Sequence, residues 1–186
     1  MKRHPQLLEQ ANALLMVVDI QEKFVPHIYK MDRVIKQSGL LIEAANALDI
    51  PTIVTEQYPA GLGPTCHAIQ SKLAMATQTF GKTSFSCCQD ETIANAITAT
   101  GRKQVILCGI ETHVCISQTA YDLIANDYQV TIAVDTVSSR DKKETKHALA
   151  RLQNAGITLA TCEAIAMELC VSSKHSAFKT ISSLIK

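Results

Sequence analysis

Several features that would assign this 186-residue chain to a specialised class are missing from its sequence. No apolar run approaches the roughly 18 residues needed to span a bilayer, and the opening segment MKRHPQLLEQ lacks the continuous apolar core of a signal peptide. The net charge is only +1, and the basic residues are scattered among acids instead of forming a stripe. The sequence therefore predicts a cytoplasmic protein that binds neither membranes nor nucleic acid.

The cysteines and glycines also lack diagnostic arrangements. The seven cysteines are odd in number, have no framework spacing and include no C-x-x-C pair, which fits a reducing compartment better than a disulfide scaffold. The glycine fingerprint of nucleotide binders is absent, because the first predicted strand is followed by DIQEKF and not by G-x-G-x-x-G. No repeat or linker divides the chain, so we expect one domain over residues 1–186, with a core at about 14–164 and a helical tail at about 173–186.

What the sequence does contain is an alternation of strand and helix patterns. Hydrophobic residues make up 47% and aromatic residues 4%, the balance of an ordinary α/β domain. Short apolar runs predict strands at 14–18, 52–55, 77–85, 105–108, 129–134 and 157–160. Helical spacing predicts helices at 31–48, 68–73, 89–100, 114–126, 138–156, 162–169 and 174–185. This alternation predicts a single doubly wound, mostly parallel, six-stranded sheet with helices on both faces, a Rossmann-like α/β architecture.

The most informative stretch is QVILCGIETHVCISQ, residues 104–118. A strand pattern stops at Gly109, passes through a polar turn and resumes as a helix at Val114, with Cys115 in its first turn. Backbone N–H groups and the dipole at a helix N-terminus favour a thiolate and can receive an oxyanion. The alternative is that Cys115 is a small buried hydrophobe. His113, in the same turn, is either a general base or a residue of the helix surface.

Two charged residues are candidates to assist this cysteine. Asp19 ends the first strand, where a carboxylate is either a cap or a site residue that takes the thiol proton and returns it to a leaving amine. Lys82 is either a solvated loop cation or a group that keeps Asp19 ionised and lowers the thiol pKa. Because sites of doubly wound sheets lie at the carboxyl ends of the strands, Asp19, the 56–65 loop and Cys115 can converge there.

Four more residues follow strand ends near the same crevice. We expect them to line a small substrate pocket, with ordinary loop packing as the alternative. They are Gln21, Phe24, Gln57 and Tyr58.

Three segments, VVDIQEKF, FGKTSFS and GIETHVCISQTAYDL, resemble in this order the isochorismatase-like cysteine hydrolase superfamily, which includes nicotinamidases and N-carbamoylsarcosine amidase. The resemblance implies an isochorismatase-type fold in which Asp19, Lys82 and Cys115 form a catalytic triad. It also implies a non-proline cis peptide bond at Ile110–Glu111, an oxyanion hole made by the N–H groups of Glu111 and Cys115, and a homo-oligomer.

Two departures from that superfamily narrow the predicted chemistry. Nicotinamidases carry an Asp-x-His metal pair after the second strand, whereas TEQYPAGLGPTCHA contains His67 alone. Because a metal needs several converging ligands, we predict no metal and no cofactor, which argues against nicotinamidase activity. Isochorismate-hydrolysing members lack the cysteine nucleophile, whereas Cys115 is present. TEQYPAGLGPT is similar to the isochorismatase-domain-containing group, which leaves the substrate open.

These observations predict a metal-independent cysteine hydrolase that cleaves a small amide or related C–N bond through a Cys115 thioester. The alternative is a catalytically silent member of the same fold that serves as an oligomerisation or partner-binding module.

Overall fold

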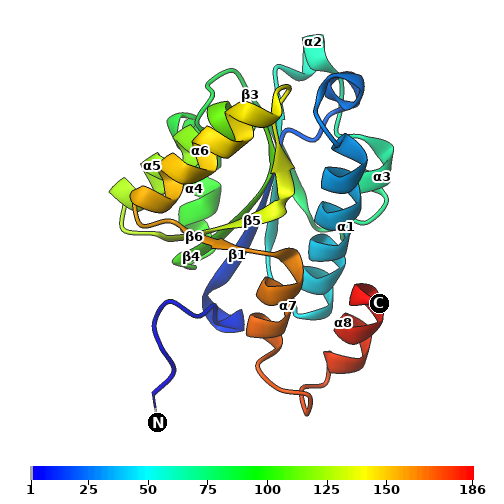
Figure 1. The fold of residues 1–186 in the computed structure, drawn as a ribbon, viewed down its shortest axis with the longest axis vertical. Coiled ribbons are helices and arrows are strands. Elements are labelled where there is room, and N and C mark those ends of the chain that lie inside the picture. The colour runs from blue at the N-terminus through cyan, green and yellow to red at the C-terminus, as the bar shows by residue number, and fades with distance from the viewer. Residues whose placement is uncertain (1) are drawn as a thin grey trace.

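The computed structural model describes residues 2–186 and contains a parallel sheet between two layers of helices (Figure 1). The strand order is β3-β2-β1-β4-β5-β6, and every neighbouring pair is parallel. This confirms the predicted doubly wound α/β architecture. The strands are β1 (Ala13–Val18), β2 (Thr52–Gln57), β3 (Gln78–Lys82), β4 (Gln104–Ile110), β5 (Gln129–Ser138) and β6 (Thr158–Ala160).

The central strand β1 shows why the sheet needs helices on both faces. Its sequence ALLMVV is apolar throughout, and all six residues are buried. Leu15 and Val17 pack with α1 (Met31–Ala47), α7 (Cys162–Cys170) and α8 (Phe178–Ile185), whereas Leu14 and Met16 pack with α4 (Glu91–Ala99), α5 (Ser117–Ala125) and α6 (Lys142–Asn154). Successive side chains of a strand point to opposite faces, so a continuous apolar run requires two covered faces.

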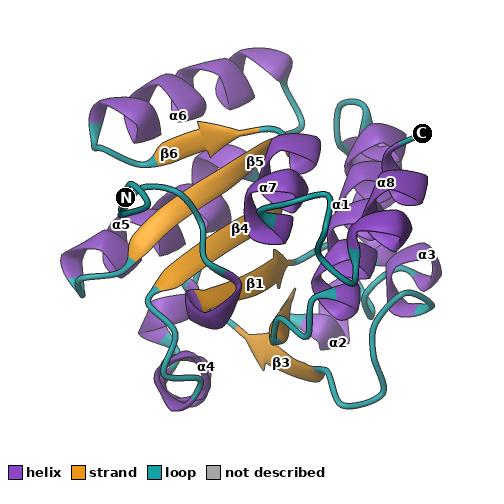
Figure 2. Ribbon diagram, turned by 90° about the horizontal axis from the view of Figure 1, so that it is seen from below, coloured by secondary structure: helices purple, strands orange, loops and turns teal. Residues whose placement is uncertain are grey.

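The helices form the two outer layers, which Figure 2 shows on either side of the strands. Several begin at a side-chain cap: Asp90 accepts hydrogen bonds from the first turn of α4, Asp141 from α6 and Thr161 from α7. The helices are α1 (Met31–Ala47), α2 (Pro59–Leu62), α3 (His67–Gln70), α4 (Glu91–Ala99), α5 (Ser117–Ala125), α6 (Lys142–Asn154), α7 (Cys162–Cys170) and α8 (Phe178–Ile185). No helix within residues 2–186 is both long enough and apolar enough to cross a membrane.

Several predicted elements have different boundaries in the structure: β5 continues to Ser138, α6 begins at Lys142, α3 ends at Gln70, and three further elements also differ. The strand expected at 77–85 stops at Lys82, because the chain turns there and the carbonyl oxygens of Ser84 and Phe85 accept hydrogen bonds from the Lys82 ammonium. The helix expected at 114–126 is divided into a π-helical turn, Thr112–Ile116, and α5. The terminal helix expected from 174 begins at Phe178.

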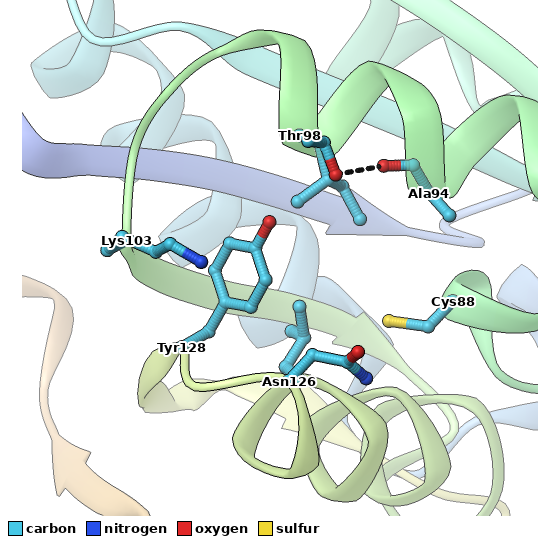
Figure 3. Close-up of a pocket in the computed structure, with 8 residues that line it drawn as sticks. Cys88, Ala94, Thr98, Lys103, Asn126 and Tyr128 are labelled. Carbon is cyan, nitrogen blue, oxygen red and sulfur yellow. Dashed lines mark hydrogen bonds between the residues drawn. The ribbon is translucent and has the colours of Figure 1, made fainter.

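A surface hollow of about 260 Å³ lies between α4 and α5 (Figure 3). The ammonium of Lys103 lies 4.2 Å from the centroid of the Tyr128 ring at one end of it. Burial raises the pKa of the Cys88 thiol to about 12, so this cysteine is protonated at neutral pH. None of the residues that line the hollow is a carboxylate or a histidine. The lining residues are Cys88, Ala94, Ile97, Thr98, Lys103, Leu123, Asn126 and Tyr128.

Candidate active site

The ends of four adjacent strands bring together the charged and nucleophilic residues singled out in the sequence. Asp19 follows β1, Gln57 ends β2, Lys82 ends β3, and Cys115 lies in the π-helical turn after β4. The chain order of the strands reverses between β1 and β4, which is where open α/β sheets form their sites. Asp19 is 1% exposed, Lys82 3% and Cys115 6%, so the three side chains meet in an almost dry environment.

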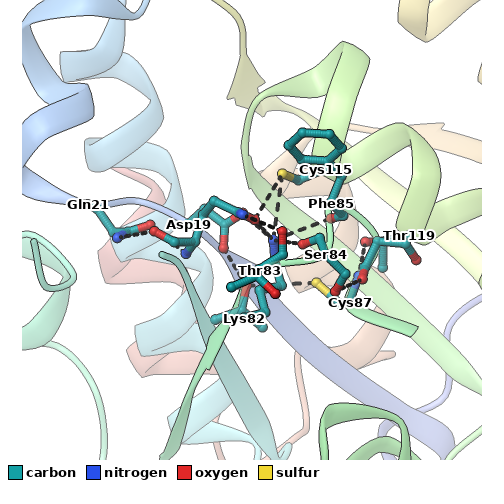
Figure 4. A network of polar contacts seen from close by, with 12 residues as sticks. Asp19, Gln21, Lys82, Thr83, Ser84, Phe85, Cys87, Cys115 and Thr119 are labelled. Carbon is teal, nitrogen blue, oxygen red and sulfur yellow. Dashed lines mark hydrogen bonds and ion pairs between the residues drawn. The ribbon is translucent and has the colours of Figure 1, made fainter. Parts of the chain in front are cut away.

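The Lys82 ammonium is the centre of this cluster (Figure 4). It lies 2.8 Å from Asp19 Oδ2 and 3.6 Å from Cys115 Sγ, and it donates a 2.6 Å hydrogen bond to Gln57 Oε1. The other carboxylate oxygen, Asp19 Oδ1, accepts a 2.8 Å hydrogen bond from the Thr55 hydroxyl. Both oxygens of Asp19 are therefore held, so that the carboxylate is fixed beside the ammonium.

The charges of this cluster act on one another. Burial, the largest single influence, lowers the pKa of Lys82, but the charge of Asp19 and its hydrogen bond, together with the nearby Cys87 and Cys115, outweigh burial, so the pKa is raised. Burial raises the pKa of the Cys115 thiol, and the charge of Asp19 raises it further, whereas Lys82 lowers it by a smaller amount. Lys82 lowers the thiol pKa, as the sequence predicted, but burial and Asp19 outweigh this effect, so the surroundings favour the neutral thiol over the thiolate. The Cys115 thiol therefore lies beside a carboxylate that can accept its proton.

The turn that carries Cys115 depends on an unusual backbone. Gly109 has a φ of +117°, and a Cβ at this position would collide with the carbonyl oxygen of Val18 in β1. The next peptide bond, Ile110–Glu111, is cis. The Glu111 carboxylate accepts hydrogen bonds from the backbone N–H and the side-chain Nε of Arg140, at 2.9 and 3.2 Å. This turn is thereby tied to the neighbouring segment between β5 and α6.

A cavity of about 70 Å³ lies directly against the cluster. Four of its walls are apolar side chains, and Phe85 is 54% exposed where the cavity approaches the surface. Ligand pockets for drug-sized molecules are several times larger, about 300–1,000 Å³, so this one suits a very small group. The lining residues are Asp19, Phe24, Gln57, Phe85, Ile110, Glu111, Val114 and Cys115.

The four residues expected to line a substrate pocket have different positions. Phe24 and Gln57 line the cavity. Gln21 does not: it is buried beneath the loop, where Nε2 donates to the carbonyl oxygens of Gln57 and Gly63 and Oε1 accepts from the Gln57 N–H. Tyr58 does not either, because the backbone turns at φ +38° into α2 and leaves the ring 56% exposed over a separate surface hollow.

Sequence reasoning missed Thr55, Phe85 and Val114. Thr55 had a usable signal, because a hydroxyl side chain at the end of the apolar run TIVT needs a polar partner when buried. Phe85 and Val114 had none, because their approach to the cavity depends on the turns after β3 and β4.

The histidines lie outside the cavity lining. His113 Nδ1 is 2.9 Å from the Ser139 hydroxyl, so this ring bridges two segments. His67 is exposed at the start of α3, and its backbone N–H donates to the Glu22 carboxylate. Over residues 2–186, no group of three or more His, Cys, Asp or Glu side chains gathers in a way that could hold a metal ion.

Fold and site together define a class: the chain is a doubly wound α/β protein with the isochorismatase fold, and its buried Asp19, Lys82 and Cys115 side chains meet at the reversal of strand order. The isochorismatase domain matches residues 12–164, and the chain therefore belongs to the isochorismatase family, whose members are generally hydrolases.

Three comparisons illustrate the relationship. Isochorismatase domain-containing protein 2 of Danio rerio is 39% identical over 179 residues, which cover 96% of this chain and 89% of the relative. The structure of the MAR1 ribonuclease from Caenorhabditis elegans is 42% identical, with a TM-score of 0.92 and coverage of 96% and 91%. The YcaC gene product from Escherichia coli, described as an octameric hydrolase of unknown specificity, shares the fold at 23% identity, with a TM-score of 0.90 and coverage of 99% and 92%.

Proposed function

We propose that the protein is a metal-independent cysteine hydrolase that cleaves a small amide or a related C–N bond. The observation that carries this proposal is the buried cluster in which Lys82 Nζ lies 2.8 Å from Asp19 Oδ2 and 3.6 Å from Cys115 Sγ, against a cavity of about 70 Å³. Nucleophilic catalysis requires a nucleophile, a group that moves its proton and donors for the oxyanion, and residues at this cavity supply all three.

The first half of the proposed reaction forms a thioester. Asp19 accepts the proton of the Cys115 thiol as the sulfur attacks the substrate carbonyl carbon, and the carbonyl oxygen becomes an oxyanion. The backbone N–H groups of Glu111 and Cys115 receive this oxyanion. In support, both residues line the cavity, and the Glu111 N–H donates no hydrogen bond to any of residues 2–186. Lys82 stabilises the negative charge while it passes from Asp19 to sulfur and oxygen.

The second half releases the acid. The tetrahedral intermediate collapses, the C–N bond breaks, and the departing nitrogen takes the proton held by Asp19. A water molecule then gives a proton to Asp19 and attacks the thioester, and the C–S bond breaks as the acid leaves. The Asp19 proton returns to sulfur, so the thiol and the carboxylate are both restored.

The test is hydrolysis of a panel of small amides by the parent protein, by Cys115→Ala and by Cys88→Ala. We expect Cys115→Ala to have no turnover and Cys88→Ala to match the parent, because Cys88 lies in the hollow between α4 and α5. Mass spectrometry of the quenched reaction should find the acyl group on the peptide that contains Cys115. Undiminished turnover in Cys115→Ala would refute the mechanism, and absence of any turnover or acyl adduct in the parent would favour the silent binding module.

The name of the C. elegans relative suggests a ribonuclease as the second candidate. The net charge of +1 and the small, largely apolar cavity favour the amidase, because nucleic-acid sites need clustered cations along a groove. The same variants decide between the two candidates when they are incubated with single-stranded and duplex RNA. Cleavage by the parent that is lost in Cys115→Ala would establish the ribonuclease at this site.

We also propose a cytoplasmic homo-oligomer. The seven cysteines are all free thiols in the structure, which supports a reducing compartment. The octamer described for the E. coli protein of this fold supports self-association. Light scattering coupled to size-exclusion chromatography tests the second point, and a monomeric mass over a range of protein concentrations would refute it.

A further inference from the structure

Gln57 is held more firmly than a residue of a pocket wall needs to be. Its backbone N–H donates to Gln21 Oε1 at 2.8 Å, and its carbonyl oxygen accepts from Gln21 Nε2 at 3.0 Å. At the tip of the side chain, Nε2 donates to the Thr83 carbonyl oxygen at 2.9 Å, and Oε1 accepts from the Lys82 ammonium at 2.6 Å. Thr83 O can only accept and Lys82 Nζ can only donate, so the two ends of the amide cannot be exchanged. The oxygen of Gln57 therefore has one fixed direction.

That oxygen faces the nucleophile. Gln57 Oε1 lies 4.0 Å from Cys115 Sγ, and Gln57 lines the same cavity as Asp19. A carbonyl oxygen has two lone pairs: the bond from Lys82 uses one, and the Cys115 thiol lies within donor distance of the other, which becomes available to a substrate N–H when the thiol proton passes to Asp19. Of the other cavity residues only Glu111 has side-chain oxygens, and two hydrogen bonds from Arg140 to Oε2 tie this carboxylate to the segment between β5 and α6. Asp19 and Gln57 are therefore the two acceptors that face a group bound at the sulfur.

We propose, on the basis of the amidase function proposed above, that Gln57 is a specificity-determining residue that selects an unsubstituted carboxamide, –CO–NH₂, as the substrate. Such a nitrogen has two N–H donors, and the two acceptors match them: Asp19 takes one N–H and Gln57 Oε1 takes the other. The departing group is ammonia, formed when the proton on Asp19 moves to nitrogen as the C–N bond breaks. A cavity of about 70 Å³, the liquid volume of roughly two water molecules, accepts this head group while the rest of the acyl chain extends past Phe85.

An N-methyl amide is rejected for two reasons. It leaves one buried acceptor without a donor, which costs the desolvation of that acceptor, and it places a methyl group where the cavity has little free volume. A site built to bind an N–H group discriminates strongly against an analogue that lacks it, by up to about 10⁴-fold. We expect the parent to prefer a primary amide by at least about 100-fold in kcat/KM.

The experiment compares acetamide, butyramide and benzamide with their N-methyl counterparts, in the parent, in Gln57→Leu and in Thr55→Val. Thr55→Val is the matched control, because it removes a hydrogen bond to Asp19 without touching the Gln57 oxygen. We expect Gln57→Leu to have a lower kcat/KM on primary amides than the parent. Its ratio of kcat/KM for a primary amide to kcat/KM for the N-methyl amide should be at least tenfold smaller. Thr55→Val should slow both amides and leave the preference unchanged. An unchanged preference in Gln57→Leu, or a parent that cleaves both amides equally, overturns the proposal.

A second measurement does not depend on turnover and separates this proposal from the amidase proposal. 2-Chloroacetamide and its N-methyl derivative are used to alkylate Cys115. For each reagent, the rate of alkylation of Cys115 is divided by its rate with free cysteine in solution, which removes the difference in intrinsic reactivity. We expect saturable inactivation of the parent, at least tenfold faster for the primary reagent, and no such difference in Gln57→Leu. Selective alkylation without hydrolysis of any amide would support the recognition of primary carboxamides by Gln57 and refute the proposed amidase function. Hydrolysis of amides with no preference for the primary form would refute only the proposed role of Gln57.

Discussion

Replacing Asp19 with Asn separates two roles of this carboxylate that oppose each other. As a base, Asp19 takes the thiol proton, so turnover depends on it. As a fixed negative charge, it raises the pKa of the Cys115 thiol and suppresses the thiolate. The asparagine has nearly the same shape and keeps an oxygen that can accept from Thr55 or Lys82. We therefore expect Asp19→Asn to lose amide turnover by at least about 100-fold while its Cys115 becomes more reactive toward iodoacetamide.

The size of the second effect follows from the geometry. Lys82 Nζ lies 2.8 Å from Asp19 Oδ2 and 3.6 Å from Cys115 Sγ, so this carboxylate oxygen is within about 6.4 Å of the sulfur. At an effective dielectric constant of about 20, a unit charge at that distance disfavours the thiolate by at least about 2.6 kcal/mol. Removing the charge increases the thiolate fraction nearly 100-fold. Because a less basic thiolate is also less nucleophilic, with a Brønsted slope of about 0.4–0.5, alkylation should accelerate by about tenfold.

The assay is peptide-resolved mass spectrometry of iodoacetamide labelling at pH 7.5, with Cys88 as an internal reference in each sample. Asp135→Asn is the matched control: its carboxylate accepts from the Cys162 N–H and its charge raises the pKa of Cys162. That variant should leave the labelling of Cys115 unchanged. Labelling of Cys115 in Asp19→Asn that is equal to or slower than in the parent would show that the carboxylate does not act on the sulfur.

Two other predictions concern stability. Lys82→Met should lower the free energy of unfolding by about 3–5 kcal/mol in urea titrations at pH 7, because it leaves the charge of Asp19 buried without an opposite charge. The pKa of Lys82 is raised above 10.5 in the folded state, so its contribution to the free energy of unfolding is complete below that pH and declines as the pH rises further. A difference in the free energy of unfolding between the parent and Lys82→Met that stays constant to pH 12 would contradict this. Gly109→Ala should destabilise the protein by at least about 3 kcal/mol, because the added Cβ would collide with the carbonyl oxygen of Val18. Gly101→Ala is the control: Gly101 has a φ of +65° but open space around it, so this variant should cost only about 1–2 kcal/mol. Thermal denaturation of both variants checks this, and equal shifts would show that the close approach of β4 to β1 is not limiting.

The sequence predicted the parts of the molecule that depend on local pattern and sheet topology. LLMVV and QVILC are apolar runs long enough for buried strands, and parallel strands end at one edge of a sheet. The proximity of Asp19, Lys82 and Cys115 follows from those two facts together with the resemblance. The elements on which this depends, β1, β3 and β4, occur where the pattern predicts them, although β3 is shorter.

The remaining features depend on contacts between distant segments, which no local pattern encodes. The π-helical turn exists because the Ile116 N–H reaches back to the carbonyl oxygen of Glu111. The raised thiol pKa depends on how completely neighbouring segments exclude water from Cys115. The outward position of Tyr58 depends on a single backbone turn at the end of β2. Propensity and periodicity average over such contacts, so they do not predict these features.

The distribution of the site over four strand ends has a consequence for how its selectivity can change. Asp19, Lys82 and Cys115 come from β1, β3 and β4, whereas the proposed recognition residue, Gln57, comes from β2. The segment after β2 is largely at the surface and contributes little to the core, so it tolerates insertions and replacements. New preferences for a head group can therefore arise by exchanging one short segment while the reactive residues keep their positions. A laboratory library confined to the exposed positions 58–60 and 64, with Gln57, Gly63 and the buried Thr65 kept, would explore this freedom with little risk to the rest of the fold.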